Sequence, residues 1–484
     1  MKLKYCLSIL VLIFVSLSCK RFLDKPYDNR VTPTLTEQFA QVLTDAYPLR
    51  HEMFTDILTD DYQYYATLAQ ATINQRFLPM YLYSDEYPPN NPSTGPENAY
   101  GEFYAKIYRA NLVIEGVMNS ERGSNEYKNA VMGEALLLRA YCHFMLVNLF
   151  GQHYDPATAA QDLGVGIVTK VSQENKKLVQ RNTVKEVYDQ IEKDATEGID
   201  YLKKGVDFIA KNPYHFTLAS ANAFMCRVKL YKGEWDQSVK YADDVIAEKG
   251  RIARNLAADL ALVRQYTREY LATMYMDAPS HPNILMSCYS STLSFLTPTG
   301  YTLCGFFVSD SLRSKYKTTT TTKDRRDSLL VSVGTVIDNQ VVCVKYNTQP
   351  NNPNSFVRAA YFTTDEVLLN RAEAVLRSGG GTVDNALADI NALRAARYSN
   401  YTLLLASDFT KASLLELVLE ERRKEFLNEG FRWFDVKRLK VPVSHVLGRG
   451  LPVAASIEAT DLRKALQIPL NEQLGNPGIQ LNPR

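Results

Sequence analysis

The sequence is poor in tryptophan and carries almost no net charge. Only 2 tryptophans occur among 484 residues, against 30 tyrosines and 20 phenylalanines. Any flat aromatic contact surface must therefore be built largely from Tyr and Phe. The 55 basic residues nearly balance the 53 acidic ones, so the formal net charge is +2. Because nucleic-acid-binding proteins need a basic surplus on one surface, we expect no nucleic-acid partner.

The catalytic motifs that a single sequence can reveal are also missing. The chain contains no Gly-x-Ser-x-Gly elbow, no Walker loop and no dinucleotide fingerprint. Its 6 histidines are scattered, and His143, which falls in an apolar helical pattern, is expected to be a satisfied core residue. We therefore expect no catalytic residues, no cofactor and no metal ion. A lipid-anchored glycosidase is the enzyme alternative, and it would require two carboxylates at the separation that hydrolysis needs.

Two kinds of charged cluster suggest ion binding or catalysis at first sight. Asp60-Asp61 and the pair of Asp324 and Asp327 are candidate Ca²⁺ ligands, although neither pair lies in a recognisable loop of oxygen ligands. The run 420–425 alternates in sign at helical offsets of three and four residues. Such offsets place opposite charges side by side, so this run is expected to form stabilising pairs on a solvated or inter-helix face.

The N-terminus has the composition of a secretory signal. Lysines at the start are followed by an apolar stretch about half as long as a membrane span. The tripeptide 16–18 then precedes Cys19, which has the shape of a lipoprotein signal-peptidase site. We therefore predict that residues 1–18 are a signal peptide and that Cys19 carries lipid. A non-lipid signal peptide or an anchor helix is the alternative, because Ser16 stands where the usual motif has Leu.

Five cysteines remain once the signal and the lipid site are set aside. They are Cys142, Cys226, Cys288, Cys304 and Cys343. An odd number with no Cys-x-x-Cys spacing argues against a disulfide framework and against a thiolate zinc site. Cys142 and Cys226 fall in apolar helical patterns and are expected to be buried. A bridge between Cys288 and Cys304 is left open.

Helical periodicity covers much of the chain. Apolar residues between positions 129 and 150 recur every three or four residues with polar residues among them, which predicts a core helix and not a membrane span. Capping boxes at Thr183 and Thr363 predict two further helices, the second of which ends at Gly379. Another long helix is predicted to end before Gly430.

Two regions have the pattern of a helix-turn-helix repeat. Residues 230–246 and 372–393 each place small residues where two helices would cross, with a glycine between the helices. This pattern is similar to the tetratricopeptide repeat. By contrast, residues 280–354 are rich in Ser, Thr, Pro and Asn and are interpreted as an irregular insertion with a short strand at 340–346. Residues 81–101 are interpreted as a loop between helical stretches.

Several segments, in order along the chain, resemble the SusD/RagB family of nutrient-binding lipoproteins. Residues 19–26 (Cys-Lys-Arg-Phe-Leu-Asp-Lys-Pro) are similar to the mature start of these proteins, and residues 133–151 are similar to their long helix. The run 421–438, which contains Glu-Arg-Arg-Lys-Glu-Phe and Phe-Arg-Trp-Phe-Asp, is similar to their C-terminal motif. Further matching segments are 54–62, 103–115, 468–469 and 482–483. The resemblance therefore covers essentially the whole chain after the signal.

The resemblance implies a mostly α fold, in which tetratricopeptide-like helical repeats form an α/α superhelix that supports an irregular, loop-rich ligand-binding half with a few short strands. It implies an N-terminal region with these helices at 19–330 and a C-terminal region at 331–484. It also implies a binding protein, not an enzyme. Such a lipoprotein is held on the outer face of the outer membrane, captures oligosaccharides or polysaccharides, and delivers them to a TonB-dependent, SusC-like transporter. Because the two residues that follow Cys19 are basic, retention of the lipoprotein in the inner leaflet stays an alternative.

Glycan recognition needs flat rings that stack on sugar C–H faces and polar side chains that bond to hydroxyls. Trp235 and Trp433 fall in the repeat and the C-terminal motif, so both are expected to be structural. The expected ligand-binding residues are Tyr81, Tyr83, Tyr87, Asn90, Asn91, Tyr289 and Tyr301, with Phe306 and Phe307 beside them. A tyrosine-lined groove also suits an extended peptide, so peptide capture stays an alternative. The other alternative is a lipid-anchored repeat scaffold without a small ligand.

Overall fold

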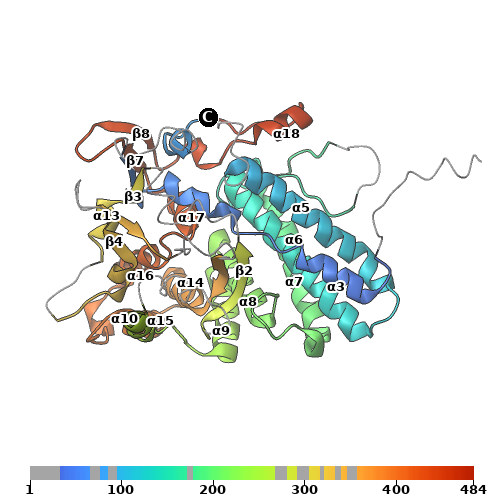
Figure 1. Ribbon diagram of the computed structural model, residues 1–484, viewed down its shortest axis with the longest axis horizontal. Helices are drawn as coiled ribbons and strands as arrows, with labels where there is room; N and C mark the ends of the chain where they lie inside the picture. The colour runs from blue at the N-terminus through green and yellow to red at the C-terminus, as the bar shows by residue number, and fades with distance from the viewer. Residues whose placement is uncertain are drawn as a thin grey trace, which may run out of the picture.

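Helices form most of the protein, and the strands are few and short (Figure 1). The computed structural model describes residues 33–65, 77–85, 95–171, 178–266, 281–290, 305–316, 321–332, 340–345 and 357–484. The mostly α fold that the sequence predicts is confirmed in these residues. The predicted signal peptide and lipid site, residues 1–18 and Cys19, lie outside them.

The helices and strands have the following bounds. The α-helices are α3 (Thr36–Thr44), α5 (Pro96–Gly116), α6 (Asn125–Phe150), α7 (Val184–Lys204), α8 (Leu218–Lys232), α9 (Trp235–Lys249), α10 (Leu256–Tyr266), α13 (Asp310–Arg313), α14 (Thr364–Arg377), α15 (Val383–Arg397), α16 (Lys411–Glu425), α17 (Phe431–Arg438) and α18 (Leu470–Gly475). The strands are β1 (Tyr62–Tyr64), β2 (Ile284–Ser290), β3 (Phe306–Val308), β4 (Leu330–Ser332), β5 (Val341–Cys343), β6 (Val357–Thr363), β7 (Val443–Val446) and β8 (Val453–Ile457). The main 3₁₀ turns are η1 (His51–Leu58), η2 (Val117–Asn119), η3 (Val206–Phe208) and η6 (Arg325–Leu329).

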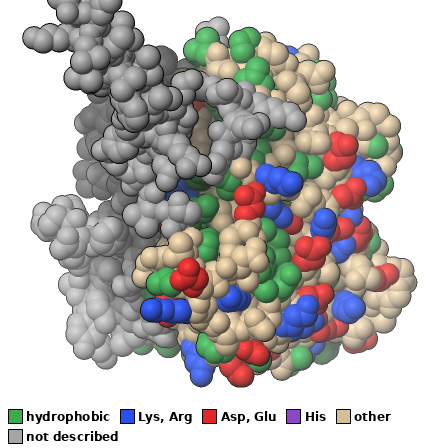
Figure 2. Space-filling view, turned by 90° about the vertical axis from the view of Figure 1, so that its right-hand side faces the viewer, with side chains coloured by type: hydrophobic (Ala, Val, Ile, Leu, Met, Phe, Trp, Pro, Cys, Tyr) green, Lys and Arg blue, Asp and Glu red, His purple; other side chains and the backbone are tan. Residues whose placement is uncertain are grey.

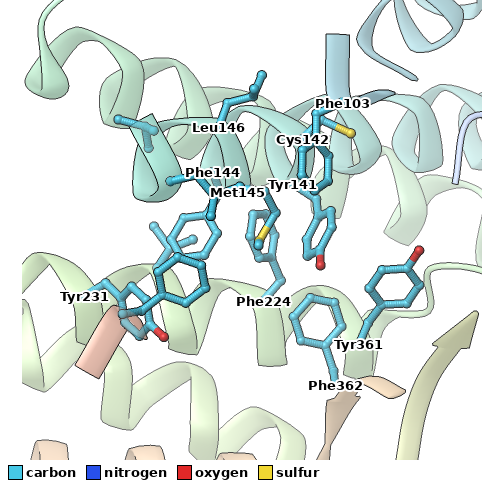
Figure 3. Close-up of a cluster of buried hydrophobic side chains, with 14 of the residues drawn as sticks. Phe103, Tyr141, Cys142, Phe144, Met145, Leu146, Phe224, Tyr231, Tyr361 and Phe362 are labelled. Atoms are coloured by element: carbon cyan, nitrogen blue, oxygen red, sulfur yellow. The ribbon is translucent and has the colours of Figure 1, made fainter. Parts of the chain in front are cut away.

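The long helix α6 is the centre of the helical half. It packs between α5 and α7, which lie beside it at the right of Figure 1. Its length and mean hydropathy of 1.4 would suit a membrane span, yet 94% of its most apolar window is buried inside the protein. Figure 3 shows its aromatic and aliphatic side chains facing residues of α8 and β6, such as Phe224 and Phe362. The predicted core helix is therefore confirmed.

The polar side chains of α6 are paired with neighbouring elements. Arg139 donates two hydrogen bonds to the carboxylate of Asp194 on α7, at 2.7 and 2.6 Å. The His143 ring lies between two backbone groups, with Nδ1 3.0 Å from the Arg139 carbonyl oxygen and Nε2 3.3 Å from the amide nitrogen of Val168. Burial lowers the pKa of His143 to about 4, so this histidine is neutral at pH 7. The predicted core role of His143 is confirmed.

Local sequence explains where several helices begin. Thr183 accepts a hydrogen bond from the amide of Glu186, and the Glu186 carboxylate accepts one from the Thr183 amide at 2.8 Å, as the capping box predicts. Thr363 likewise accepts from the Glu366 amide at 3.1 Å and begins α14. The carboxylate of Glu366 does not return to Thr363, however, because it binds Arg227 of α8. The ion pair between Glu366 and Arg227 therefore takes the place of the hydrogen bond that the Glu366 carboxylate would accept from the Thr363 amide in a full capping box.

Both predicted repeats form pairs of antiparallel helices. Gly233 adopts a left-handed conformation with φ of +78° and lets α8 turn directly into α9. Ala242 of α9 is fully buried, and Ser238 donates to the Cys226 carbonyl across the pair at 2.9 Å. The pair α14 and α15 repeats this arrangement, and α14 packs on α9. Small residues also permit the crossing of α6 and α7, since a Cβ on Gly133 would lie 2.7 Å from a carbonyl oxygen of α7.

The strands form four antiparallel pairs: β1 with β3, β2 with β6, β4 with β5, and β7 with β8. The predicted strand at 340–346 is confirmed as β5, and the irregular insertion 280–354 supplies β2, β3 and β4 as well. The predicted loop at 81–101 is shorter than expected, because α5 already begins at Pro96. Proline is well suited to this first helical position, where its missing N–H costs no hydrogen bond.

Residues near the C-terminus close over the end of α6. The Leu466 amide donates to the Leu149 carbonyl at 2.9 Å, and the Asn482 side chain donates to the Phe150 carbonyl at 2.8 Å. Arg181 donates to the Asn482 side-chain oxygen at 2.8 Å, which fixes this segment from the other side. The main hydrophobic core likewise combines residues from before and after position 330. The division of the chain at that position stays a prediction.

The four cysteines that the structure describes, Cys142, Cys226, Cys288 and Cys343, are buried free thiols. Burial of Cys142 and Cys226 was predicted and is confirmed. Cys288 lies in β2 as a free thiol, so the bridge left open between it and Cys304 is not formed. Cys304 itself lies outside the described residues.

Candidate functional site

The two regions expected to hold the ligand come together in the fold. β1 pairs with β3 so that Tyr64 lies opposite Phe306. The rings of Tyr81 and Phe306 lie 5.4 Å apart, and Tyr64 contacts both of them at 5.9 and 5.1 Å. Tyr81, shortly before residues 86–94, and Phe306, shortly after residues 291–304, therefore belong to one group of contacting aromatic rings.

Tyr81 also belongs to a series of stacked aromatic side chains. His445 of β7 stacks on Tyr81 at a centroid distance of 3.8 Å and on Tyr83 at 4.9 Å. Tyr83 in turn stacks on Trp433 of α17 at 6.5 Å. We call Tyr81, His445, Tyr83 and Trp433 the aromatic column. It joins the segment before residues 86–94 to the C-terminal third of the chain.

Hydrogen bonds hold the polar edges of the aromatic column inside the protein. The Tyr81 hydroxyl donates to the Val446 carbonyl and the Tyr83 hydroxyl to the Leu58 carbonyl, each at 2.9 Å. His445 places Nε2 3.1 Å from the Thr59 carbonyl oxygen. Burial lowers the pKa of His445, although its bonds to backbone carbonyls act in the opposite direction.

This burial corrects the roles expected of two tyrosines. Tyr81 is 1% exposed and Tyr83 is 8% exposed, and both rings already stack on protein side chains. Neither ring can also offer a free face to a sugar. The small cavity beside Tyr83 and Trp433 holds about 10 Å³, which is no more than a water molecule needs. Tyr81 and Tyr83 are therefore buried packing residues and do not themselves form a ligand-binding surface.

The other expected ligand residues fall in different places. Tyr289 lies in β2, opposite Arg358 of β6, in a different strand pair from the one beside the aromatic column. Phe306 and Phe307 are buried in β3. The remaining candidates lie outside the described residues: Tyr87, Asn90, Asn91 and Tyr301.

Charged side chains border the aromatic column. The Arg463 guanidinium lies 6.0 Å from the centre of the Tyr83 ring and binds Asp461 at 2.7 Å. Nearby, Arg484 binds Asp85 at 2.6 Å, at the point where the chain enters residues 86–94. These partly exposed groups supply hydrogen-bond donors and acceptors next to the entry of that segment.

His445 and Arg463 were not found from the sequence. The β7 strand is only four residues long and gives no motif. Its alternation does place His445 on the same buried face as Val443, which is the one signal that the sequence contains. Arg463 lies within the 3₁₀ turn Leu462–Lys464, which Asp461 caps, and its position beside Tyr83 results from long-range packing.

The candidate calcium ligands are already neutralised by cationic side chains. Asp60 accepts two hydrogen bonds from Arg432 at 2.8 and 3.0 Å, and Asp61 accepts one from Arg423 at 2.5 Å. Asp324 binds Arg326 at 2.8 Å, whereas Asp327 is exposed. The structure does not favour Ca²⁺ at these candidate aspartates, because the carboxylates of Asp60, Asp61 and Asp324 each have a guanidinium partner. No cluster with the composition of a metal site occurs among the described residues.

The charged run 420–425 is structural, as predicted, but most of its partners lie in other elements. Glu421 binds Arg326 at 2.5 Å, and Glu425 binds Arg397 at 2.7 Å. Both carboxylates are buried. Burial alone would raise the pKa of Glu425, yet the neighbouring guanidinium groups lower it to about 2. These pairs join α16 to η6 and α15 and leave no free catalytic carboxylate in the run.

Comparison with known proteins agrees with this architecture. A family model described as starch-binding and associating with the outer membrane matches residues 21–230, and the model of the SusD family matches residues 298–464. The chain belongs to the SusD/RagB family. A SusD-like protein of Formosa agariphila is 23% identical over 397 residues, which are 70% of this chain and 71% of that protein.

Solved structures of SusD-type proteins share the fold. A SusD superfamily protein from Bacteroides thetaiotaomicron has a TM-score of 0.72 and 22% identity, and the match covers 93% of this chain and 100% of that one. A SusD-like carbohydrate-binding protein from Bacteroides vulgatus has a TM-score of 0.70 and 16% identity, with 92% and 97% coverage. At these identities the likeness establishes the fold of the SusD/RagB protein and not its ligand.

Proposed function

We propose that this SusD/RagB protein is a non-catalytic, outer-membrane-associated binder of oligosaccharides or polysaccharides. Membership of the family supports the proposal, because the matching family model is described as starch-binding and associating with the outer membrane. The Bacteroides vulgatus relative, a SusD-like carbohydrate-binding protein, favours the same class of ligand.

The observation that supports the proposal is that described residues close in sequence to the two expected ligand segments share one group of packed aromatic rings. Residues 86–94 follow Asp85, and residues 291–304 precede Gly305, so both are attached beside the contact between Tyr81 and Phe306. Their sequences supply Tyr87, Asn90, Asn91 and Tyr301, which combine stacking rings with amide groups. A site anchored in this way has the aromatic and polar chemistry that sugar binding needs.

The aromatic column gives this site a stiff support. Tyr83 stacks on two neighbouring rings and bonds through its hydroxyl, so it has few alternative rotamers. Residues 86–94 therefore follow a well-packed segment.

The proposal includes delivery to a TonB-dependent, SusC-like transporter and anchoring through lipid on Cys19. The helical half offers a broad surface for such a protein partner. On the face turned to the viewer in Figure 2, acidic and basic side chains are interspersed with hydrophobic ones. This face has charges of both signs and lacks the basic surplus of a nucleic-acid site.

Isothermal titration of the soluble chain, started after Cys19, tests the ligand class. The panel contains plant and host polysaccharides and, separately, a mixed peptide digest. We expect heat with at least one glycan, and the double change Tyr87→Ala and Asn90→Ala should weaken it about tenfold or more, which is about 1.4 kcal/mol. Tyr108→Ala, an exposed tyrosine on α5, serves as the matched control.

Other outcomes lead to other functions. Heat only with peptides would replace the glycan with a peptide ligand, and no heat with either would favour a lipid-anchored scaffold. The anchor is tested separately by fractionating cells that produce the full chain. Cys19→Ala should move the protein out of the membrane fraction, and retention of the variant would contradict a lipid anchor on that residue.

A further inference from the structure

A hollow of about 330 Å³ lies beside the first residues that the structure describes. Its walls are formed by Pro33 and Thr34, by α3, by the end of α5, and by η2 with the residues that follow it. In Figure 1, α3 and α5 lie beside each other at the right of the molecule. We call this hollow the α3–α5 hollow.

The chain enters α3 in a fixed direction. Leu35 forms a parallel bridge with Glu121, in which the Glu121 amide donates to the Thr34 carbonyl at 2.7 Å. Next to this bridge, the hydroxyls of Thr36 and Ser120 lie 2.7 Å apart, and Thr36 is fully buried. Because the bridge is parallel, the chain just before Leu35 runs alongside the residues just before Glu121. Those residues lead back to η2 and the end of α5, which line the hollow.

The apolar part of the α3–α5 hollow lies on the side that Pro33 faces. Pro33, Phe39 and Leu112 all line it, and Phe39 packs directly on the α5 backbone at Gly116, where a Cβ would collide with the ring. The residue before a proline is restricted to extended conformations. Side chains on either side of an extended residue point the same way. The sequence around Pro33 therefore directs the side chain of Val31 toward this apolar part.

Charge also favours contact between this hollow and the chain that leads to it. The charged residues that line the hollow are Glu115 and Glu121, and both are exposed. The Glu115 carboxylate accepts a hydrogen bond from the Val171 amide at 2.8 Å, but neither glutamate forms an ion pair with the described residues. Residues 20–32 carry four basic side chains against two acidic ones. The hollow and this segment therefore have opposite charges.

We propose that the α3–α5 hollow is the docking site of this chain's own residues 30–32. Val31 packs on Phe39 and Leu112, and Arg30 pairs with Glu115 at the rim. The segment is attached to the wall of the hollow through Pro33, so its effective concentration there is high and a weak contact is sufficient to hold it. Continuity of the chain, its direction at Leu35 and its charge all specify this occupant.

Docking of residues 30–32 fixes the point at which the lipid tether leaves the protein. Eleven residue steps separate Arg30 from Cys19, and a fully extended chain spans at most about 3.6 Å per residue. The tether between the hollow and the membrane is then no longer than about 40 Å. This tether length rests on the proposed lipid anchor at Cys19, whereas the docking itself does not.

Limited trypsin digestion of the soluble chain, started after Cys19, tests the docking. Trypsin can cut after Arg30 only when this segment leaves the hollow. Leu112→Asp places a carboxylate in the apolar part of the hollow and should speed this cleavage at least tenfold. Tyr108→Asp introduces the same carboxylate one turn earlier on α5, at an exposed position outside the hollow, and should leave the rate unchanged. Equal rates in the wild type and Leu112→Asp would overturn the proposal.

Disulfide trapping tests the location independently of that variant. Val31→Cys is combined either with Leu112→Cys or, as the control, with Glu37→Cys, which is exposed on α3 and does not line the hollow. Glutathione disulfide oxidises the pairs, and mass spectrometry of tryptic peptides measures each bridge. We expect the bridge between positions 31 and 112 to form at least ten times faster than that between positions 31 and 37. Similar rates would mean that the segment samples both positions, and would refute the docking.

Both experiments use neither glycan nor lipid, so their outcome is separate from that of the proposed function. If Cys19→Ala stayed in the membrane fraction, only the tether length would be lost. If the cleavage rate and the trapping rates both failed to depend on Leu112, the docking would be wrong. The proposed glycan binding and lipid anchor would then still stand.

Discussion

His445 stacks face to face on Tyr81, with ring centroids 3.8 Å apart and ring planes 3° from parallel. The two residues are far apart in the sequence, and their contact fixes the segment before residues 86–94 against the strand pair β7–β8. Tyr81 is thus a packing residue with one polar edge. Its substitution should therefore change stability before it changes ligand recognition.

Tyr81→Ala should lower the free energy of unfolding by about 3–5 kcal/mol, as for other buried aromatic side chains replaced by alanine. Urea unfolding followed by circular dichroism measures the change. Tyr108→Ala removes the same side chain from a position that is 42% exposed and should cost no more than about 0.5 kcal/mol. A loss below about 1 kcal/mol for Tyr81→Ala would show that the ring is not packed as described.

The buried ion pair between Arg227 and Glu366 should be strongly coupled. Arg227 donates two hydrogen bonds to the carboxylate, both at 2.6 Å, and its guanidinium lies 4.4 Å from the centre of the Phe362 ring. Arg227→Met leaves Glu366 buried without its charged partner and should cost about 3–5 kcal/mol. Adding Glu366→Gln should recover part of this loss. Additive effects in the double-mutant cycle would contradict a direct pair.

His215 should make stability depend on pH near neutrality. Its Nδ1 lies 2.6 Å from the Glu134 carboxylate, and this hydrogen bond raises the pKa of His215 despite partial burial. A raised histidine pKa stabilises the fold fully below the unfolded-state pKa, about 6.5, and the stabilisation is lost as the pH rises through the folded-state pKa. The pH window is therefore from about 6.5 upward.

The measurement is the difference in urea midpoint between the wild type and His215→Gln from pH 6 to pH 9. We expect the wild type to be the more stable at pH 6 and the difference to shrink as the pH rises. Glu134→Gln, which removes the negative charge, should abolish the pH dependence of the difference. A constant difference across the range would show that His215 does not titrate against Glu134.

The buried thiols should resist modification in the folded protein. Burial raises the pKa of Cys226 to about 12 and that of Cys288 and of Cys343 to about 11, so little reactive thiolate is present at pH 8. The soluble chain after Cys19 has five cysteines. A thiol reagent at pH 8 should therefore react only slowly with the four described cysteines in the folded protein. In guanidinium without reductant it should titrate all five groups, and a count of three would indicate a bridge between Cys288 and Cys304.

Local patterns were sufficient to predict the helical half. The periodicity of α6 and the caps at Thr183 and Thr363 depend on residues close in sequence, and the structure confirms all three helices. The partners of Glu366 and Glu421 could not be predicted in this way, since Arg227 and Arg326 lie far away in the sequence. For the same reason the sequence of the run 420–425 indicated ion pairs within its own helix. It did not indicate the pairs with Arg326 and Arg397 that the structure shows.

The site was predictable only in part. Tyrosine-rich irregular segments indicated two candidate regions, and the contact between Tyr81 and Phe306, which composition did not predict, brings the described residues beside them together. Composition could not distinguish a ring that supports the site from a ring that faces a ligand, because that depends on neighbours such as His445 and Trp433. Burial of Tyr81 and Tyr83 is decided by those distant residues and not by the loop that carries them.

The closure of α6 by residues 466 and 482 has a consequence for synthesis of the chain. The carbonyls of Leu149 and Phe150 accept hydrogen bonds from the Leu466 backbone amide and the Asn482 side chain, which the ribosome adds more than three hundred positions later. The carbonyl end of α6 therefore acquires these two hydrogen bonds only after residues 466 and 482 have been synthesised.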